Sequence, residues 1–279
     1  MKKIAPNVYV STDYPGVNVG FISLPRGVIA VDAPTLPQDA LDWKRRIAEI
    51  AEGPILYVVL TDVHPDRMLS AGLLQAPIVA CRAAYDQAIS YTDGFWRGVI
   101  DGWTRRYPQT TADLSVTHVA LPEIMLNDRL TLHKGGADVT IQHVAGNAPG
   151  SVWVHLREHN VLFTGDLLVA ETHPFMSTAP NTKTWLNTLK ALRRKSFSDT
   201  IIVPGRGPIC DNSAAGPLGE YVALARRRAR SLVKGTGIDR ATAVTDLLPL
   251  FPVPEGEHNL VQRRIRAGLD RLCEELQAD

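Results

Sequence analysis

The stretch LYVVLTDVHPDR (residues 56–67) decides the fold and also indicates a site. Its apolar, β-branched first half predicts a buried strand, which ends abruptly in polar and chargeable residues. Because alternate side chains of an extended chain point the same way, Asp62, His64 and Asp66 are expected to converge just past the strand's end. Open α/β sheets carry their chemistry at such places. The three residues indicate a metal or acid–base site; the alternative is a polar loop whose Asp caps a short helix before Met68.

Length and composition are those of a soluble globular protein. The 279 residues are 45% hydrophobic and 21% charged, with a formal net charge of +1, so no overall charge favours nucleic acid or an anionic membrane. The start, MKKIAPN, lacks the apolar segment of a signal peptide, and no run is long enough to span a bilayer. Cys81, Cys210 and Cys273 lie far apart without a CxxC pair. This argues against disulfides or a cysteine zinc site and predicts a cytoplasmic protein.

The first half alternates strands and helices around the opening stretch. Strands are expected at 8–10, 17–22, 28–32 and 78–81, and helices at 39–52 and 68–74. This βαβ rhythm predicts parallel strand pairs with helix-covered faces. Residues 83–107 have a helical pattern rich in aromatic residues, which fits either core packing or the wall or lid of an apolar pocket.

The second half repeats the order of strands followed by helices. Strands are expected at 130–132, 139–144, 151–156, 161–164 and 200–203, a helix at 183–195, and tail helices at 217–234, 239–249 and 257–277. The tail contains the basic run RRRAR (226–230). Because it shares one helix with apolar residues, and no basic excess exists elsewhere, a solvated helix face explains it better than nucleic-acid binding.

Four polar breaks follow strand ends: DVHPDR (62–67), GNAPGS (146–151), FTGD (163–166) and PGRGP (204–208). Their order and spacing resemble the metallo-β-lactamase-fold hydrolase superfamily over roughly residues 5–210. This resemblance implies a four-layer α/β fold, an αββα sandwich, with a shallow active site along one edge of two packed sheets. It divides the chain into a metallo-β-lactamase-like domain (1–212) and a C-terminal helical extension (213–279). Many members of that family hydrolyse esters, thioesters, lactones or lactams.

The resemblance also implies a set of metal ligands, most of which this chain has lost. The family's motifs are His-x-His-x-Asp-His, a His before Thr-Pro-Gly-Ser, an Asp, and a His within Pro-Gly-His-Gly-Pro, which together hold two zinc ions. His64, Asp66 and Asp166 match this pattern. The departures are Asp62, Arg67, Asn147 and Arg206, each standing where the family has a histidine. The sequence is therefore identified as a degenerate member of the family.

The two metal positions are affected differently. Asp62, His64 and Asn147 still carry donor atoms, a set that favours a weakly held, oxygen-preferring ion such as Mg²⁺ or Mn²⁺. The second position would use Asp66, Arg67 and Arg206, and a protonated guanidinium has no lone pair with which to bind a cation. Our hypothesis is that Arg67 and Arg206 occupy this space and pair with Asp66 and Asp166.

Without a zinc-bound hydroxide, hydrolysis would need a protein base. His64, Asp66 and Asp166 are the candidate catalytic residues, and such a base typically contributes about 10²–10⁴-fold. Ordinary dizinc hydrolysis is therefore not expected. Four other histidines (His133, His143, His155 and His173) could serve as replacement ligands; the first three lie within predicted strands, where a structural histidine is the simpler interpretation, and His173 follows Asp166 in a loop.

Three hypotheses follow. In the first, the protein binds a small anionic, amphiphilic ligand through Arg67, Arg206, Asn147 and His173, with weak or no zinc-dependent hydrolysis and no fully occupied cofactor. In the second, it hydrolyses a small ester, thioester or lactone with a single metal ion at Asp62, His64 and Asn147, assisted by Asp166. In the third, the tail mediates association. The sequence does not set the substrate or the oligomeric state, and a homodimer is one alternative by fold-level analogy.

Overall fold

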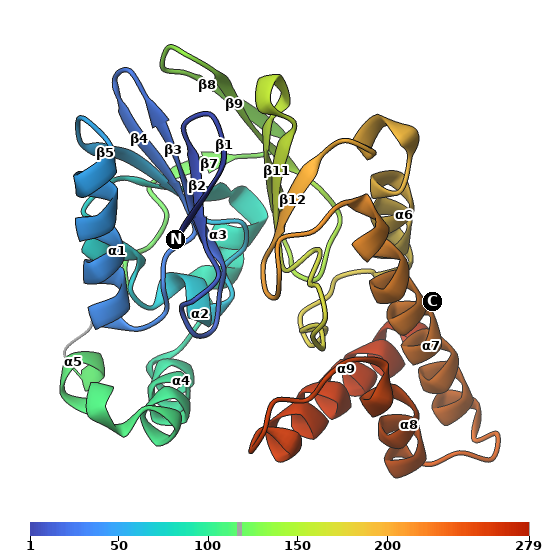
Figure 1. Cartoon of the computed structure of the whole chain (residues 1–279). Coiled ribbons are helices and arrows are strands. Elements are labelled where there is room, and N and C mark those ends of the chain that lie inside the picture. Colours follow the sequence, from blue (N-terminus) through green and yellow to red (C-terminus); the bar gives the residue numbers. More distant parts are fainter. Residues whose placement is uncertain (116–118, 279) are drawn as a thin grey trace.

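Two β-sheets packed face to face form the centre of the computed structural model, which describes residues 1–115 and 119–278 (Figure 1). Neighbouring strands of the first sheet follow the sequence: β1 (Lys2–Ala5), β2 (Val8–Ser11), β3 (Val19–Leu24), β4 (Gly27–Val31), β5 (Ile55–Val59), β6 (Ile78–Cys81) and β7 (Ile124–Leu126). The second sheet has the order β12 (Ile201–Pro204), β11 (Val161–Gly165), β10 (Val152–Leu156), β9 (Asp138–His143) and β8 (Arg129–His133).

Helices cover the outer faces of both sheets (Figure 1). The α-helices of the described residues are α1 (Pro37–Ile50), α2 (Pro65–Met68), α3 (Arg82–Ala88), α4 (Asp93–Arg106), α5 (Thr111–Ser115), α6 (Thr182–Leu192), α7 (Ala215–Lys234), α8 (Arg240–Leu247) and α9 (His258–Ala278). Short 3₁₀ turns are η1 (Ala71–Leu74), η2 (Pro108–Thr110), η3 (Arg157–His159), η4 (Lys195–Phe197), η5 (Asn212–Ala214) and η6 (Leu248–Leu250). No described helix has the length and apolar character needed to cross a bilayer.

Strand pairing brings the polar strand ends to one edge. β4, β5, β6 and β7 pair in parallel, and so do β11 and β12. The carboxyl ends of adjacent parallel strands point the same way, so the residues that follow them lie side by side. This is why segments far apart in the sequence meet at one site.

Hydrophobic periodicity explains the outer layers. Pro37 starts α1 at a position that tolerates its missing N–H, and Ala40, Trp43 and Ile47 bury one face of the helix against the first sheet. On the other side, α6, α7 and α9 share one hydrophobic cluster with the second sheet. That cluster crosses residue 212, because Leu162 and Ile202 of the sheet lie in it together with α7 and α9.

The expected αββα sandwich with a C-terminal helical extension is confirmed. Two short strands are additions to the prediction. β1 is charged and only partly buried, and β7 has three residues, so neither carries a clear alternating pattern. The expected helix at 68–74 is instead α2 followed by the 3₁₀ turn η1, and the aromatic segment divides into α3 and α4.

Candidate functional site

The polar residues gather where the parallel strands end. Asp32 follows β4, Thr61 and Asp62 follow β5, Asp166 follows β11, and Arg206 lies just after β12. Asp32 has a left-handed backbone (φ 57°), a conformation that Asp tolerates better than most residues. Its carboxylate accepts hydrogen bonds from the Thr61 backbone N–H (2.9 Å) and hydroxyl (2.7 Å).

Arg67 is the buried centre of this cluster. Its side chain has no exposed surface, and its Nε donates to Asp32 Oδ2 (3.1 Å) and Thr61 Oγ1 (3.0 Å). Nη2 donates to Asp166 Oδ1 (2.7 Å), and Nη1 lies 3.3 Å from Asp62 Oδ1. One guanidinium therefore binds three carboxylates from three separate strand ends.

Arg206 connects two carboxylates of the same cluster. Its Nε donates to both Asp166 oxygens (3.1 and 3.2 Å), and its Nη1 donates to Asp66 Oδ2 (3.0 Å) and to the Gly16 carbonyl. The guanidinium thus lies between the two carboxylates that the resemblance assigns to the second metal. Gly205 has to be glycine here, since a Cβ would overlap Asp166 Oδ1 and Arg67 Nη2.

Electrostatics keeps the Asp66 and Asp166 carboxyl groups ionised. Burial opposes the charge on Asp166, but Arg206 and Arg67 outweigh it and lower the pKa of this carboxyl. Burial is also outweighed at Asp66, where His64 and Arg206 lower the pKa of the carboxyl. Asp32 differs: burial dominates and raises its pKa to about 6 in spite of Arg67. The nearby Asp62 carboxylate makes a smaller contribution that also raises the pKa of Asp32.

His64 presents a donor to the cavity beside the cluster. Its Nδ1 lies 3.3 Å from the Asp66 backbone N–H and 3.3 Å from Arg206 Nη2, and both of these groups can only donate. The Asp66 carboxylate is farther away, at 3.5 Å. This assigns the proton of the neutral ring to Nε2. Burial lowers the pKa of His64, so the ring is neutral at pH 7.

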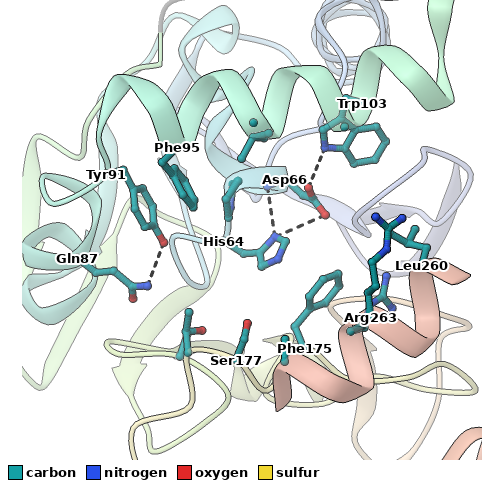
Figure 2. A pocket seen from close by; sticks show the side chains of 18 of the residues that line it. His64, Asp66, Gln87, Tyr91, Phe95, Trp103, Phe175, Ser177, Leu260 and Arg263 are labelled. Carbon is teal, nitrogen blue, oxygen red and sulfur yellow. Dashed lines mark hydrogen bonds and ion pairs between the residues drawn. The ribbon is translucent and has the colours of Figure 1, made fainter. Parts of the chain in front are cut away.

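A cavity of about 470 Å³ opens beside His64 and Asp66 (Figure 2). Figure 2 shows Trp103 of α4 above them, where its Nε1 donates to Asp66 Oδ1 (3.0 Å), and shows Phe175 below. Helix α4 forms one wall and α9 the opposite wall. The apolar lining comprises Tyr91, Phe95, Val99, Trp103, Phe175 and Leu260. Of the two interpretations of the aromatic segment, the pocket-wall interpretation holds for Tyr91, Phe95 and Trp103.

The residues present do not fit the metal centre implied by the fold. At the second position, Arg206 occupies the space between Asp66 and Asp166 and offers no lone pair. At the first position, Asn147 directs its amide Nδ2 at Asp62 Oδ2 (3.5 Å), so the amide donates to the carboxylate. Asp62 Oδ1 already accepts the His64 backbone N–H (2.8 Å). Among the described residues, no group of three or more His, Cys, Asp or Glu side chains is arranged to hold a metal ion.

Three of the expected ligand-binding residues do not line the cavity. Arg67 is fully buried, and Asn147 is buried beside Asp62. His173 lies away from the cluster, where its ring nitrogens are 3.4 Å from the Tyr221 hydroxyl and 3.3 Å from the Phe251 carbonyl. A ligand in the cavity would contact none of these three directly. Arg206 lines a smaller adjoining cavity, His64 and Asp66 line the main one, and Asp166 is buried beneath them.

The structure adds residues that the sequence analysis did not assign to the site. Asp32 could have been found, because it ends a strand next to the one that carries Asp62. Phe175 and Arg264 could not, because their contact with the site depends on how the loop after β11 and helix α9 pack. Phe175 lies against the His64 ring at a centroid distance of 4.4 Å.

Among the described residues, the other histidines lie outside the cluster, and one of them gives a prediction for pH dependence. Burial, assisted by Arg157, lowers the pKa of His155 to about 4. The unfolded chain takes up this proton near pH 6.5, whereas the folded protein does so only near pH 4, so stability should fall as the pH drops through this window. We expect His155→Gln to reduce the change of stability with pH, measured as the change in the urea midpoint between pH 7 and pH 4.5. A variant as pH-sensitive as the wild type would contradict this. The variant should keep part of the pH dependence, because burial also lowers the pKa values of His64 and His173.

Sequence comparison gives one family and a few distant relatives. The family model described as "Metallo-beta-lactamase superfamily" matches residues 13–206. The acyl-coenzyme A thioesterase MBLAC2 of Homo sapiens is 29% identical over 131 residues, which are 43% of this chain and 43% of the relative. The linear primary-alkylsulfatase of Pseudomonas sp. (strain ATCC 19151) is 23% identical over 224 residues, 67% of this chain and 40% of the relative. The chain thus spans about two fifths of the length of the curated relatives it matches.

Solved structures agree at the level of the fold. A metallo-beta-lactamase family protein from Thermus thermophilus superposes with a TM-score of 0.70 and 20% identity, covering 99% of this chain and 95% of that one. The sec-alkylsulfatase Pisa1 from Pseudomonas sp. gives a TM-score of 0.69 and 16% identity, covering 98% and 49%. At such low identities these superpositions establish a shared architecture only, and the chemistry has to be inferred from the residues of the site.

Proposed function

The chain belongs to the metallo-β-lactamase superfamily, and from that premise we propose that it binds a small ligand with an anionic group and an apolar body, with little or no zinc-dependent hydrolysis. The observation that carries the proposal is the Arg206 guanidinium between Asp66 and Asp166. It supplies at that position the positive charge that a cation would otherwise supply. No cofactor is required at full occupancy.

The main cavity supports the ligand class. Its volume of about 470 Å³ lies within the range of about 300–1,000 Å³ that is usual for small-molecule sites. Its walls are largely apolar, while Arg106, Arg263 and Arg264 contribute positive charge. Two relatives are named as an acyl-coenzyme A thioesterase and an alkylsulfatase, and an acyl or alkyl chain is part of both names.

The test combines metal analysis with calorimetric titration of decanoate in the presence of a chelator. We expect substoichiometric zinc and saturable decanoate binding that the chelator does not change. Filling the cavity with Val99→Trp should weaken decanoate binding about tenfold or more, equivalent to about 1.4 kcal/mol. Leu41→Trp, at an exposed position on α1, is the matched control and should leave binding unchanged.

Two results would contradict the proposal. One is about one divalent ion per chain together with hydrolysis of a nitrophenyl ester that is lost on chelation; this would favour the single-metal hydrolase using Asp62, His64 and Asn147. The other is decanoate binding that Val99→Trp leaves intact, since that would place the ligand elsewhere. A homodimer and a cytoplasmic location remain predictions from the sequence, for which sedimentation and cell fractionation are the measurements.

A further inference from the structure

Arg264 of α9 is a half-buried cation without a carboxylate partner among the described residues. Its Nη1 donates to the His173 carbonyl (3.0 Å), and its guanidinium lies 3.8 Å from the centroid of the Phe175 ring. Its Nε is buried without a hydrogen-bond partner. A buried polar group of this kind costs free energy until something pairs with it.

The surroundings of Arg264 disfavour its charge. Burial lowers its pKa to about 10, and nearby Arg206 adds to this effect, while Asp66 and Asp166 offset it only in part. The side chain is still protonated at pH 7. An anion beside it would therefore relieve an electrostatic cost that is already present in the free protein.

The other guanidinium groups near the cavity are less available. Arg67 and Arg206 form ion pairs with the carboxylates of the cluster, although Arg67 Nη1 has only its ion pair with Asp62 and no hydrogen bond. Arg106 pairs with Glu257 (2.8 Å), and Arg263 is exposed to solvent, where a charge interaction is weak. Arg264 alone among these five combines partial burial with the lack of an ion pair in the described part of the chain.

Arg264 also lies at the boundary between an apolar cavity and a polar one. It lines the main cavity and an adjoining polar cavity of about 190 Å³, and Phe175, Asp66 and Arg106 line both as well. Val99 and Phe95 of α4 also line the main cavity. A ligand with its charged end at Arg264 could lay an apolar chain along these two side chains.

We propose that Arg264 anchors the anionic group of the ligand, and that the ligand is a single-chain amphiphile ending in one oxyacid group, a carboxylate or a sulfate. The second hydrogen-bond donor to the anion is His64 Nε2–H, for which no described residue is an acceptor. This inference rests on the proposed function and adds the ligand class and the anchoring residue. It also assigns ligand recognition to α9, which lies beyond the segment matched by the family model.

The experiment titrates the full-length protein with decanoate, decyl sulfate and decanol, the last having the chain without the charge. We expect Arg264→Gln to weaken the binding of the preferred anion about tenfold or more and to leave the binding of decanol unchanged, because hydrogen bonds between charged groups are stronger than those between neutral ones. Arg264→Lys should recover part of the affinity. Arg266→Gln, an exposed position on the same helix, is the control and should bind all three ligands as the wild type does.

The outcomes separate this inference from the function on which it rests. If the wild type binds an anion, and Val99→Trp abolishes that binding while Arg264→Gln does not, the cavity is the site and Arg264 is not the anchor. Equal losses of decanol and anion affinity in Arg264→Gln would also overturn the anchor, since they would indicate lost packing; circular dichroism of each variant checks the fold. Binding of neither anion by the wild type would overturn the ligand class, whereas a stoichiometric metal ion would overturn the proposed function itself.

Discussion

Arg67→Met is expected to lower the free energy of unfolding by about 3–5 kcal/mol, a large part of the about 5–15 kcal/mol that is typical of a folded protein. Methionine fills a similar volume, so the loss would be mainly electrostatic. Arg67 is the fully buried group that binds Asp32, Asp62 and Asp166, and without it their charges lie close together away from water. Urea denaturation at pH 7 measures the change.

Two further variants isolate the cause. Arg227→Met removes an exposed arginine from α7 and should change stability by less than about 0.5 kcal/mol. Asn tolerates the left-handed backbone of position 32 as Asp does, and Asp32→Asn removes one of the three charges. In the Arg67→Met background, Asp32→Asn should therefore restore part of the stability. A loss below about 1 kcal/mol in Arg67→Met would refute a stabilising role for this guanidinium.

We expect Arg206→His to bind zinc at this position and the wild type not to bind it. The Arg206 guanidinium is surrounded by Asp66 Oδ2, an Asp166 oxygen and His64 Nδ1, at 3.0–3.3 Å from its nitrogens. Carboxylates and imidazole are zinc ligands, and the new histidine adds a lone pair. We expect the variant to carry close to one zinc ion per chain. Zinc at about one hundred times the dissociation constant should raise its melting temperature by about 5–10 °C.

The matched control keeps the charge. Arg206→Lys retains a protonated cation between the carboxylates and should neither bind zinc nor respond to it. Zinc content measured by atomic emission, before and after chelation, decides the outcome. If Arg206→His stays free of zinc, then the guanidinium is not what keeps a cation from the space between Asp66 and Asp166.

Much of the fold could be predicted because its signals are local. The apolar run before Asp62 and the spacing of Trp43 and Ile47 each reflect burial against one sheet. The order of the four polar breaks carries the resemblance from which the topology could be predicted. What the sequence does not carry is the depth of each residue: Arg67 and Arg206 look alike in their motifs, yet one is fully buried and the other borders a cavity.

The site was predictable to the extent that it depends on strand ends. Asp62, His64 and Asp66 follow β5 of the first sheet, whereas Asp166 and Arg206 follow the neighbouring strands β11 and β12 of the second. They come together because the two sheets pack face to face. His173 follows Asp166 just as closely in sequence, but the loop directs its ring into the core against Tyr221 and Phe251. The docking of α9 brings Arg264 to the cavity through contacts that span the whole chain, and no local pattern encodes such contacts.

The two arginines of the cluster, Arg67 and Arg206, have a consequence for how this protein depends on its environment. A zinc enzyme must acquire its ion, can receive the wrong one, and loses it when supply fails. Here the counter-ion at the old metal position is translated with the polypeptide, one copy per molecule and always in the same place. Under the proposed function, the charge balance of this cleft does not depend on the supply of zinc in the cell.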